Sequence, residues 1–228
     1  FGWGVTAEDL MRVRGENFFE VYNGHPSVHN NGDSIHSSTE QIWDIVNSMR
    51  LTEFDLPLLY GLATDDGHDY HKIPSRAAEP GRGWVTVLAE ELTPASLIES
   101  LEAGRFYASS GVTIDEITVT AESMTVKVHP ETDATFRIEF IGTKKGFDRT
   151  SEPLRDEQGQ KMHVTRKYSP EVGAVLKSAD DTTATYEFTG QELYVRARVT
   201  SSRLHPNPSI PGEFERAWTQ PVRPSVAN

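Results

Sequence analysis

The periodicity of the apolar residues changes once along this 228-residue chain, near residue 112, and this change constrains the fold more than any other feature. Before it, short apolar runs typical of buried strands alternate with segments whose apolar residues recur at helical spacing. After it, apolar and polar residues alternate at every second position without intervening helices. The first pattern predicts βαβ units with a mainly parallel sheet, and the second predicts an antiparallel sandwich. We therefore predict two domains, residues 1–112 and residues 113–228.

Local signals place the elements of both domains. Thr6, Ser38 and Thr93 are residues that commonly cap helices, and helical spacing follows each of them, up to Gly15 and Gly104 in the first and last case. In the second domain, the long polar stretches are expected to be loops. The expected strands cover residues 18–22, 58–63, 84–88, 106–108, 114–119, 124–128, 136–140, 186–188 and 193–199, and the expected long loops cover residues 143–183 and 200–217.

Charge and composition limit the partners. The chain has 22 basic and 34 acidic residues, a net charge of -12, which repels phosphate backbones and anionic membrane surfaces. Nucleic acid and membranes are therefore not expected as partners, and no apolar run approaches the roughly 20 residues of a membrane span. A phosphorylated small molecule remains compatible, because a bound dication reverses the local sign of the charge. Since the chain has no cysteine, any metal must be held by imidazole and carboxylate groups.

The strongest candidate for a functional site is Asp66-Gly67-His68, which directly follows the apolar run at 58–63. Residues two apart in an extended turn can point to the same side, and glycine lets the backbone bend between them. A carboxylate and a neutral imidazole placed in this way suit zinc, manganese or iron. The neighbouring Asp65 makes two like charges adjacent, which is unfavourable unless a cation or a hydrogen-bond donor offsets them. The alternative interpretation of this motif is a solvated turn.

Other acidic and imidazole groups lie near this motif in the sequence. Five of the eight histidines fall between positions 25 and 71. Glu20 and His25 belong to the first apolar run and the loop after it, so both can approach Asp66 at the carboxyl edge of a parallel sheet. His29 and His36 show no pattern of partner spacing and are expected to be solvated loop histidines.

Four segments of the first domain occur in an order that is more specific than any one of them. They read FEVYNGHP at 19–26, LATDDGHDYH at 62–71, PGRGWV at 80–85 and AGRFYASSG at 103–111. Together they resemble the polymerase-and-histidinol-phosphatase (PHP) metallohydrolases, in particular the CehA/McbA-like branch. The resemblance covers residues 1 to about 112, roughly the carboxyl-terminal half of that domain. It implies the carboxyl-terminal part of a distorted (β/α)7 barrel, followed here by the antiparallel β-sandwich domain.

The resemblance also implies a metal site. The family holds up to three divalent ions, with histidines and acidic residues as ligands. Asp66 and His68 match its last metal motif, Glu20 would bind a metal or orient a ligand, and His25 would be a ligand or a proton shuttle. The resemblance also places His71, and Arg82 further along, where substrate contacts are reasonable. The candidate catalytic residues are therefore His25, as a proton shuttle, and His71.

The chain departs from the family in its first motifs. The His-x-His near the family's amino terminus is absent, and so is the His-Pro-Asn that usually precedes a segment like Phe1-Gly2-Trp3-Gly4. The chain starts without methionine or a leader, which predicts an internal start. A catalytic zinc requires about three protein ligands and an open position. The site is therefore expected to be incomplete unless an N-terminal segment or a second chain completes the barrel.

The second domain resembles the β-sandwich that follows the metallohydrolase half in some bacterial proteins, on residues 191–199 and 217–221. One interpretation is a carbohydrate- or partner-binding module in which Trp218 stacks on the ligand. The other, which strand alternation favours, is a packing domain whose Arg196 and Arg198 face water. The sandwich extension favours a periplasmic or secreted protein by analogy, while the lack of cysteine suits a reducing compartment equally well.

These observations predict a metal-dependent hydrolase that uses metal-activated water on a small phosphoester, or on another ester or amide. No Ser-His-Asp arrangement competes, and Gly81-Arg82-Gly83 is too short to be a phosphate-binding loop. The alternative is a non-catalytic binding or structural protein, in which the barrel half is a relic and the sandwich binds a carbohydrate or a protein.

Overall fold

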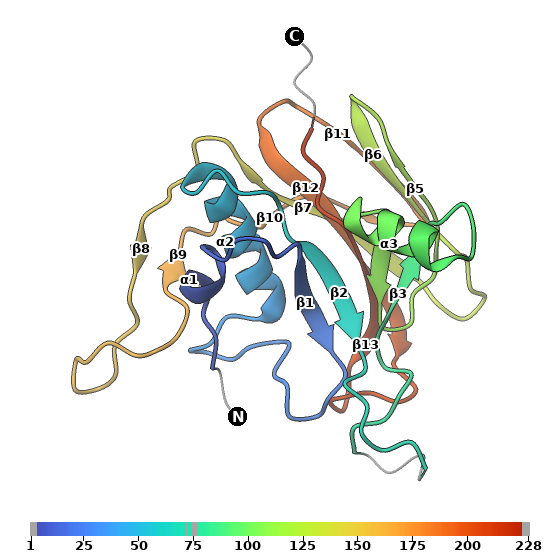
Figure 1. Ribbon diagram of the computed structural model, residues 1–228, viewed down its shortest axis with the longest axis horizontal. Coiled ribbons are helices and arrows are strands. Elements are labelled where there is room, and N and C mark those ends of the chain that lie inside the picture. Colours follow the sequence, from blue (N-terminus) through green and yellow to red (C-terminus); the bar gives the residue numbers. More distant parts are fainter. Residues whose placement is uncertain (1–3, 72, 74–76, 225–228) are drawn as a thin grey trace.

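The structure is a computed structural model that describes residues 4–71, 73 and 77–224 (Figure 1). Residues 1–3, which carry the expectation of an internal start, lie outside the described residues. Among the described helices, none is long and apolar enough to cross a membrane.

The sequence signals of the first half are confirmed locally. Thr6, Ser38 and Thr93 are the N-caps of the three helices within the described residues, and each side chain accepts a hydrogen bond from the backbone N–H three residues later. The first helix ends at Leu10, well before Gly15. The elements are α1 (Ala7–Leu10), β1 (Phe18–Asn23), α2 (Thr39–Thr52), β2 (Tyr60–Thr64), β3 (Trp84–Val87), α3 (Pro94–Glu102) and β4 (Phe106–Ser109).

The second half is formed by strands, as the period-two pattern predicts. The elements are β5 (Ile114–Val119), β6 (Ser123–Val128), β7 (Phe136–Lys144), β8 (Ser151–Glu152), β9 (Lys167–Tyr168), β10 (Ala174–Asp180), β11 (Thr183–Glu187), β12 (Glu192–Leu204) and β13 (Phe214–Thr219). The prediction of structureless loops at 143–183 and 200–217 is wrong, because these stretches contain β8, β9, β10 and parts of β12 and β13. Strand β10 forms an edge of its sheet and is partly exposed, which explains its polar composition.

The main sheet has six strands in the order β10-β7-β12-β13-β4-β3, and every described pair in it is antiparallel. A three-stranded sheet, β11-β6-β5, and the parallel pair β1–β2 are separate. The expectation of a mainly parallel sheet holds for β1 and β2 and is wrong for β3 and β4, which pair with each other and with β13. A short apolar run indicates a buried strand, and the run looks the same whether that strand pairs with its neighbours in parallel or antiparallel. The boundary at 112 falls between β4 and β5, so the six-stranded sheet contains strands from both sides of it.

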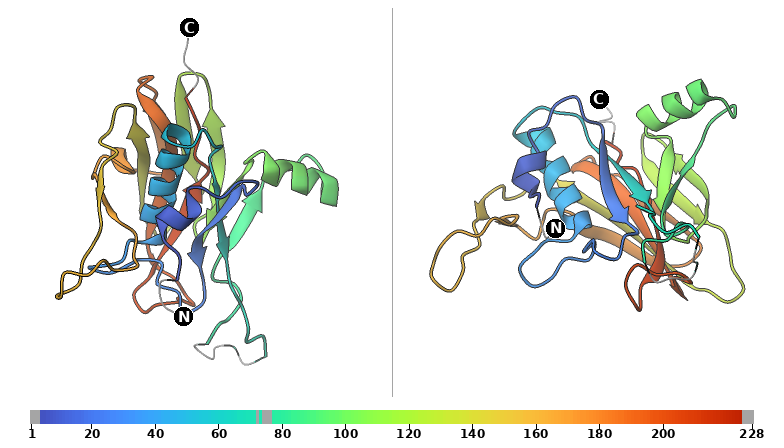
Figure 2. Two further views of the ribbon diagram at one scale, coloured as in Figure 1. Left: turned by 60° about the vertical axis from the view of Figure 1, so that its left-hand side comes forward. Right: turned by 60° about the horizontal axis from the view of Figure 1, so that its bottom comes forward.

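The inner strands of the six-stranded sheet are buried on both faces (Figures 1 and 2). Neighbouring residues of β4 and β13 show this directly. Tyr107 and Ala217 belong to the sandwich core shared with the three-stranded sheet, whereas Ala108 and Trp218 belong to a second core under α2, β1 and β2. Successive side chains of a strand point to opposite faces of the sheet, so neighbouring residues of one strand can belong to two different cores. The fold is thus a β-rich sandwich with an additional layer on its outer face.

Helix α2 fixes this outer layer. The Trp43 indole N–H donates to the Leu59 carbonyl at 2.8 Å, and the Asn47 side chain exchanges hydrogen bonds with the Leu59 backbone at 2.8 and 3.2 Å. On the opposite side, the hydroxyl groups of Ser48 and Thr143 are 2.8 Å apart, which ties α2 to β7. Helix α2 therefore positions β2, and with it the turn that carries Asp66, relative to the main sheet.

The prediction that Arg196 and Arg198 face water is wrong. Arg196 is only 1% exposed and forms two hydrogen bonds with Asp44 of α2, at 2.7 and 2.9 Å, while its guanidinium lies over the Trp43 ring. Arg198 is half-buried and pairs with Glu40 and with a carboxylate of β7. The alternation of β12 was read correctly, but the sequence pattern does not show that α2 covers its polar face.

The buried ion pairs under α2 predict that acid destabilises the fold. Burial opposes ionisation of Glu40, but Arg196 and Arg198 outweigh it and lower the pKa of Glu40 from 4.5 to about 2. Because the pKa of the folded state lies below that of the unfolded state, this contribution is complete above pH 4.5 and is lost as the pH falls towards 2. It amounts to at most about 3 kcal/mol.

We therefore expect Glu40→Gln to flatten the dependence of the free energy of unfolding on pH between 5 and 2.5, as measured by urea denaturation. Glu122→Gln, a change at an exposed carboxylate in the β5–β6 turn, is the matched control and should keep the wild-type slope. Equal slopes for wild type and Glu40→Gln would contradict the assignment.

Candidate functional site

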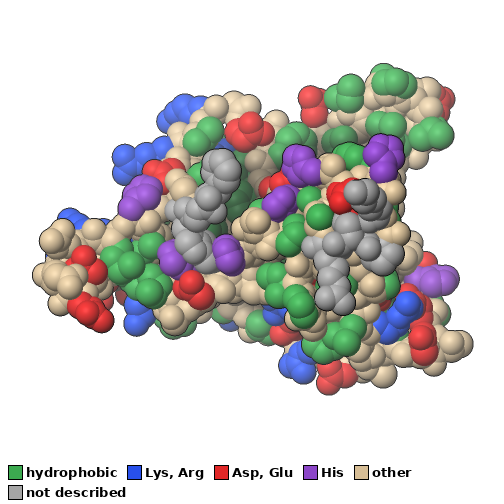
Figure 3. Space-filling model, turned by 90° about the horizontal axis from the view of Figure 1, so that it is seen from below, with side chains coloured by type: hydrophobic (Ala, Val, Ile, Leu, Met, Phe, Trp, Pro, Cys, Tyr) green, Lys and Arg blue, Asp and Glu red, His purple; other side chains and the backbone are tan. Residues whose placement is uncertain are grey.

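Strands β1 and β2 bring the two segments of the candidate site to one edge. They are parallel and Asn23 is in register with Thr64, so the turns that follow both strands leave the sheet side by side. In Figure 1 these carboxyl ends lie at the bottom of the molecule, and Figure 3 shows that face with several histidine side chains on it. The parallel pairing that the sequence predicted therefore positions the candidate residues.

Asp66 and His68 contact each other directly. The Oδ1 atom of Asp66 lies 3.0 Å from Nε2 of His68, and both side chains are accessible, at 42% and 69%. Asp66 has a φ of 47°, in the left-handed region that few residues other than glycine adopt and that Asp tolerates better than most. Two atoms that bind one zinc ion tetrahedrally lie roughly 3.4 Å apart. At this distance Nε2 of His68 donates its proton to Oδ1 of Asp66, so a cation could bind both atoms with little movement only by displacing that proton.

Glu20 is joined to Asp66 through an asparagine. The Nδ2 group of Asn23 donates to Oε2 of Glu20 at 2.9 Å and to Oδ2 of Asp66 at 3.3 Å, and the Thr64 hydroxyl donates to the other Glu20 oxygen. One amide therefore joins the carboxylate of Glu20 on β1 to that of Asp66 in the turn after β2, and Oδ1 of Asp66 is directed to His68. Sequence reasoning missed Asn23, because an amide at a strand end carries no spacing signal of its own.

His25 lies beside His68, with ring centroids 5.7 Å apart in an edge-on arrangement. Its Nδ1 accepts a hydrogen bond from the Ser27 backbone N–H at 3.0 Å. A neutral imidazole whose Nδ1 is an acceptor carries its proton on Nε2, and that nitrogen then has no lone pair for a metal. This arrangement favours the proton-shuttle role for His25 over the role of ligand.

The remaining histidines lie outside this group. His71 is exposed, and among the described residues it forms no hydrogen bond or ion pair with the other candidates. His29 is exposed. His36 is half-buried, and its Nδ1 lies 2.8 Å from a carboxylate oxygen of Asp33, so it is not simply solvated.

Asp65 and Arg82 connect the turns after β1 and β2 to neighbouring loops by hydrogen bonds. Asp65 Oδ1 accepts the backbone N–H groups of Arg82 and Gly83 at 2.6 and 2.9 Å, so donors offset its charge beside Asp66. Arg82 is only 1% exposed, and its guanidinium donates to the Gly24 carbonyl at 2.9 Å and to Asn207 at 3.1 and 3.2 Å. The expectation that Arg82 contacts substrate is therefore wrong, because its donors are used to join three turns.

Gly24 is required where these turns meet. A Cβ atom at this position would lie 2.7 Å from the Arg82 Cβ and 3.0 Å from the Asp65 carbonyl oxygen. Contacts this short do not occur in folded proteins without a shift of the backbone. The glycine of the Asn-Gly-His segment therefore lets the β1 turn approach the Asp65 turn closely enough for His25 to reach His68.

Within residues 4–71, 73 and 77–224, no three side chains of His, Asp or Glu converge on one point where they could hold a metal. The residues that fit a dication are the Asp66–His68 pair, whose donor chemistry and spacing suit one, with Glu20 next to it. No protein-family model matches the chain, and no curated protein matches it. The resemblance to PHP hydrolases accordingly stays a prediction from the sequence.

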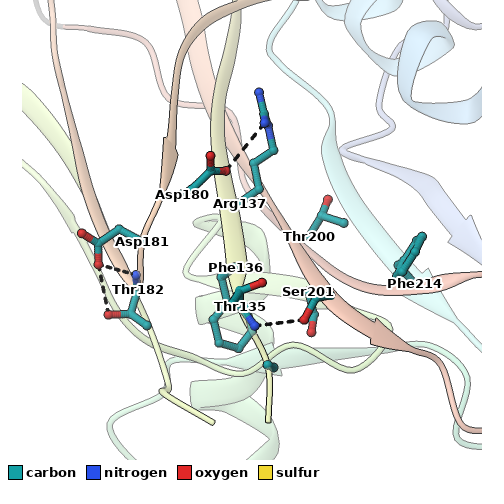
Figure 4. Close-up of a pocket in the computed structure, with 11 residues that line it drawn as sticks. Thr135, Phe136, Arg137, Asp180, Asp181, Thr182, Thr200, Ser201 and Phe214 are labelled. Atoms are coloured by element: carbon teal, nitrogen blue, oxygen red, sulfur yellow. Dashed lines mark hydrogen bonds and ion pairs between the residues drawn. The ribbon is translucent and has the colours of Figure 1, made fainter. Parts of the chain in front are cut away.

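A separate groove of about 730 Å³ lies on the sandwich, at the start of β7 and the end of β10 (Figure 4). Polar side chains of both strands line it, and Phe214 of β13, which is 41% exposed, contributes an aromatic ring. Trp218, the residue proposed to stack on a sugar, is only 2% exposed and packs on Tyr22 at a ring distance of 5.7 Å. Trp218 therefore cannot serve as a carbohydrate platform.

Proposed function

We propose that this chain provides Asp66 and His68 to a divalent-metal site and that the protein is a metal-dependent hydrolase of small phosphoesters or related esters and amides. The observation that carries the proposal is the 3.0 Å contact between Asp66 Oδ1 and His68 Nε2 at the carboxyl edge of a parallel strand pair. Zinc, manganese and iron all suit such a donor pair. The resemblance to the PHP family supports a complete site of up to three ions, with the remaining ligands supplied by an N-terminal segment or a second chain.

Each residue of the site has a distinct part in this proposal. A bound dication lowers the pKa of a coordinated water to about 7 and polarises the scissile oxygen. Asn23 holds Asp66 in place through its hydrogen bonds to Glu20 and Asp66, and Glu20 adds negative charge beside the pair. His25 carries a proton on Nε2 next to His68 and donates it to the leaving group.

Hydrolysis of a chromogenic phosphomonoester and of a chromogenic carboxylate ester tests this function. We expect turnover that requires added zinc, manganese or iron and stops with a chelator. His25→Gln is expected to lower kcat by about 10²–10⁴ while leaving the metal content unchanged, because His25 moves a proton and does not bind the ion. His29→Gln, a change at an exposed histidine of the same loop, is the matched control.

Two results would contradict these assignments. Turnover that is unaffected by the chelator would exclude a metal-dependent reaction. A His25→Gln variant that loses metal together with activity would make His25 a ligand and not a proton shuttle.

A second candidate function is a non-catalytic module that binds a carbohydrate, and the groove in Figure 4 favours it. Its aromatic ring and surrounding hydroxyl, carboxylate and guanidinium groups are the chemistry that binds sugars. Loss of oligosaccharide binding in Phe214→Ala, in a chain that folds without metal, would support this candidate over the hydrolase.

A further inference from the structure

Asn23 connects several residues of the candidate site. Its amide donates to Glu20 and to Asp66, and its Oδ1 accepts the backbone N–H of His25 at 2.8 Å. The loop at 205–213, between β12 and β13, contacts the residues on both sides of Asn23 in the chain. In Figure 1 this loop lies at the bottom of the molecule, near the carboxyl ends of β1 and β2. Contacts that fix Asn23 therefore also fix the site.

The first of these contacts holds Tyr22, the residue before Asn23. The Tyr22 hydroxyl donates to Oε2 of Glu213 at 3.2 Å, and the backbone N–H and hydroxyl of Ser209 donate to the same oxygen at 3.1 and 3.0 Å. Tyr22 is 2% exposed and Glu213 is 9% exposed. Burial and the Glu213 carboxylate raise the pKa of Tyr22 above its usual value, so the hydroxyl keeps its proton and remains a donor. Strand β1 is thus bonded to the loop immediately before Asn23.

The second contact holds Gly24, the residue after Asn23. The Gly24 carbonyl accepts a hydrogen bond from the buried Arg82, whose other donors reach Asn207 of the loop at 3.1 and 3.2 Å. The Asn207 backbone N–H donates in turn to Nδ1 of His205 at 3.0 Å. The backbone N–H of His205 donates to the carbonyl of Glu213 at 2.8 Å, so both contacts come from one hydrogen-bonded loop.

We propose that the 205–213 loop positions the candidate site, with Glu213 and Asn207 as its positioning residues. The loop belongs to the part of the chain after residue 112, which carries none of the candidate metal or catalytic residues. Because it holds both neighbours of Asn23, a shift of the loop moves Asn23 and the site residues bonded to it. This role rests on the proposed function, since positioning affects turnover only if those residues take part in the reaction.

Nuclear magnetic resonance of the histidine side chains in the metal-free protein tests this role without an assay of activity. We expect Glu213→Leu and Tyr22→Phe each to shift the imidazole signals of His25 and His68, because each removes one partner of the bond between β1 and the loop. Tyr22→Phe keeps the aromatic ring, so a shift would report movement of the site and not loss of a ring. Glu213→Gln keeps an acceptor oxygen and should restore the wild-type signals.

Glu192→Leu is the matched control. Glu192 is 2% exposed and accepts the Tyr186 hydroxyl at 2.7 Å, so it repeats the buried pair of tyrosine and glutamate at the first residue of β12, whereas the loop follows the last. Its replacement should lower the melting temperature, as Glu213→Leu does, and leave the signals of His25 and His68 unchanged.

Turnover provides a second readout. In the ester hydrolysis assays, Tyr22→Phe and Asn207→Leu are expected to lower kcat about 10- to 100-fold, the usual effect of losing an outer partner of a site residue. KM should change little, because neither variant removes a contact of the substrate. Asn207→Asp keeps the side-chain acceptor for Arg82 and should restore most of the rate.

Unchanged histidine signals in both Tyr22→Phe and Glu213→Leu would overturn the positioning role. An equal shift in Glu192→Leu would overturn it as well, because the signals would then reflect lower stability alone. A wild type without turnover would contradict the proposed hydrolase, and shifted signals in the metal-free variants would still support positioning of Asn23 by the loop. Circular dichroism shows whether each variant is folded, and Tyr22→Phe, which removes a single hydroxyl, decides the result if Glu213→Leu is not.

Discussion

Replacing Arg196 by methionine is expected to lower the free energy of unfolding by about 3–5 kcal/mol, as measured by urea denaturation. Arg196 lies between α2 and the main sheet, forms two short hydrogen bonds with Asp44 and pairs with Glu40. Methionine fills a similar volume but leaves the Asp44 carboxylate, which is 4% exposed, with the Tyr194 hydroxyl as a donor at 2.8 Å. A buried charge that has lost its counter-ion is among the most costly single changes in a folded protein.

Two further variants separate the buried ion pair from a general effect of charge. Arg198→Gln removes a half-buried guanidinium from the same strand and is expected to cost only about 1 kcal/mol, because solvent screens it. The double variant Arg196→Met/Asp44→Leu removes both charges and should recover most of the stability that the single variant loses. A single variant within 1 kcal/mol of the wild type, or a double variant no more stable than the single one, would contradict this account of α2.

The elements that are determined by residues close together in the sequence were predicted well. Short local sequence patterns indicate the helix caps at Thr6, Ser38 and Thr93 and the strands around them. The pairing of strands is different, because it is set by residues far apart. Strand β4 pairs with β13, whose Ala217 and Trp218 are more than 100 positions away. The apolar run at 106–108 does not indicate that its partner strand is antiparallel.

The same division applies to the candidate site. The contact between Asp66 and His68 could be predicted because the two residues are two positions apart, and the approach of Glu20 followed from parallel pairing of β1 and β2. The interpretation of Arg82 was wrong because its partner, Asn207, lies 125 positions further along the chain. Similarly, Arg196 was expected to face water because a period-two pattern identifies two faces of a strand but not what covers each one.

Loss of metal binding on replacement of both Asp66 and His68 by alanine is the second large effect that we expect. These residues provide the donor pair of the proposed site, and removal of even an outer-shell partner of a metal ligand typically costs 10- to 100-fold in affinity. Loss of both ligands should therefore reduce the affinity by at least about 100-fold. The matched control is Asp69→Ala/His71→Ala, which removes the same two residue types at the same spacing from the same segment.

Elemental analysis of the purified chain, after dialysis with zinc, manganese or iron and removal of free ions, tests the proposed metal site most directly. We predict that the wild type and Asp69→Ala/His71→Ala retain equal amounts of metal and that Asp66→Ala/His68→Ala retains much less. Equal metal content in all three proteins would contradict the assignment of Asp66 and His68 as metal ligands.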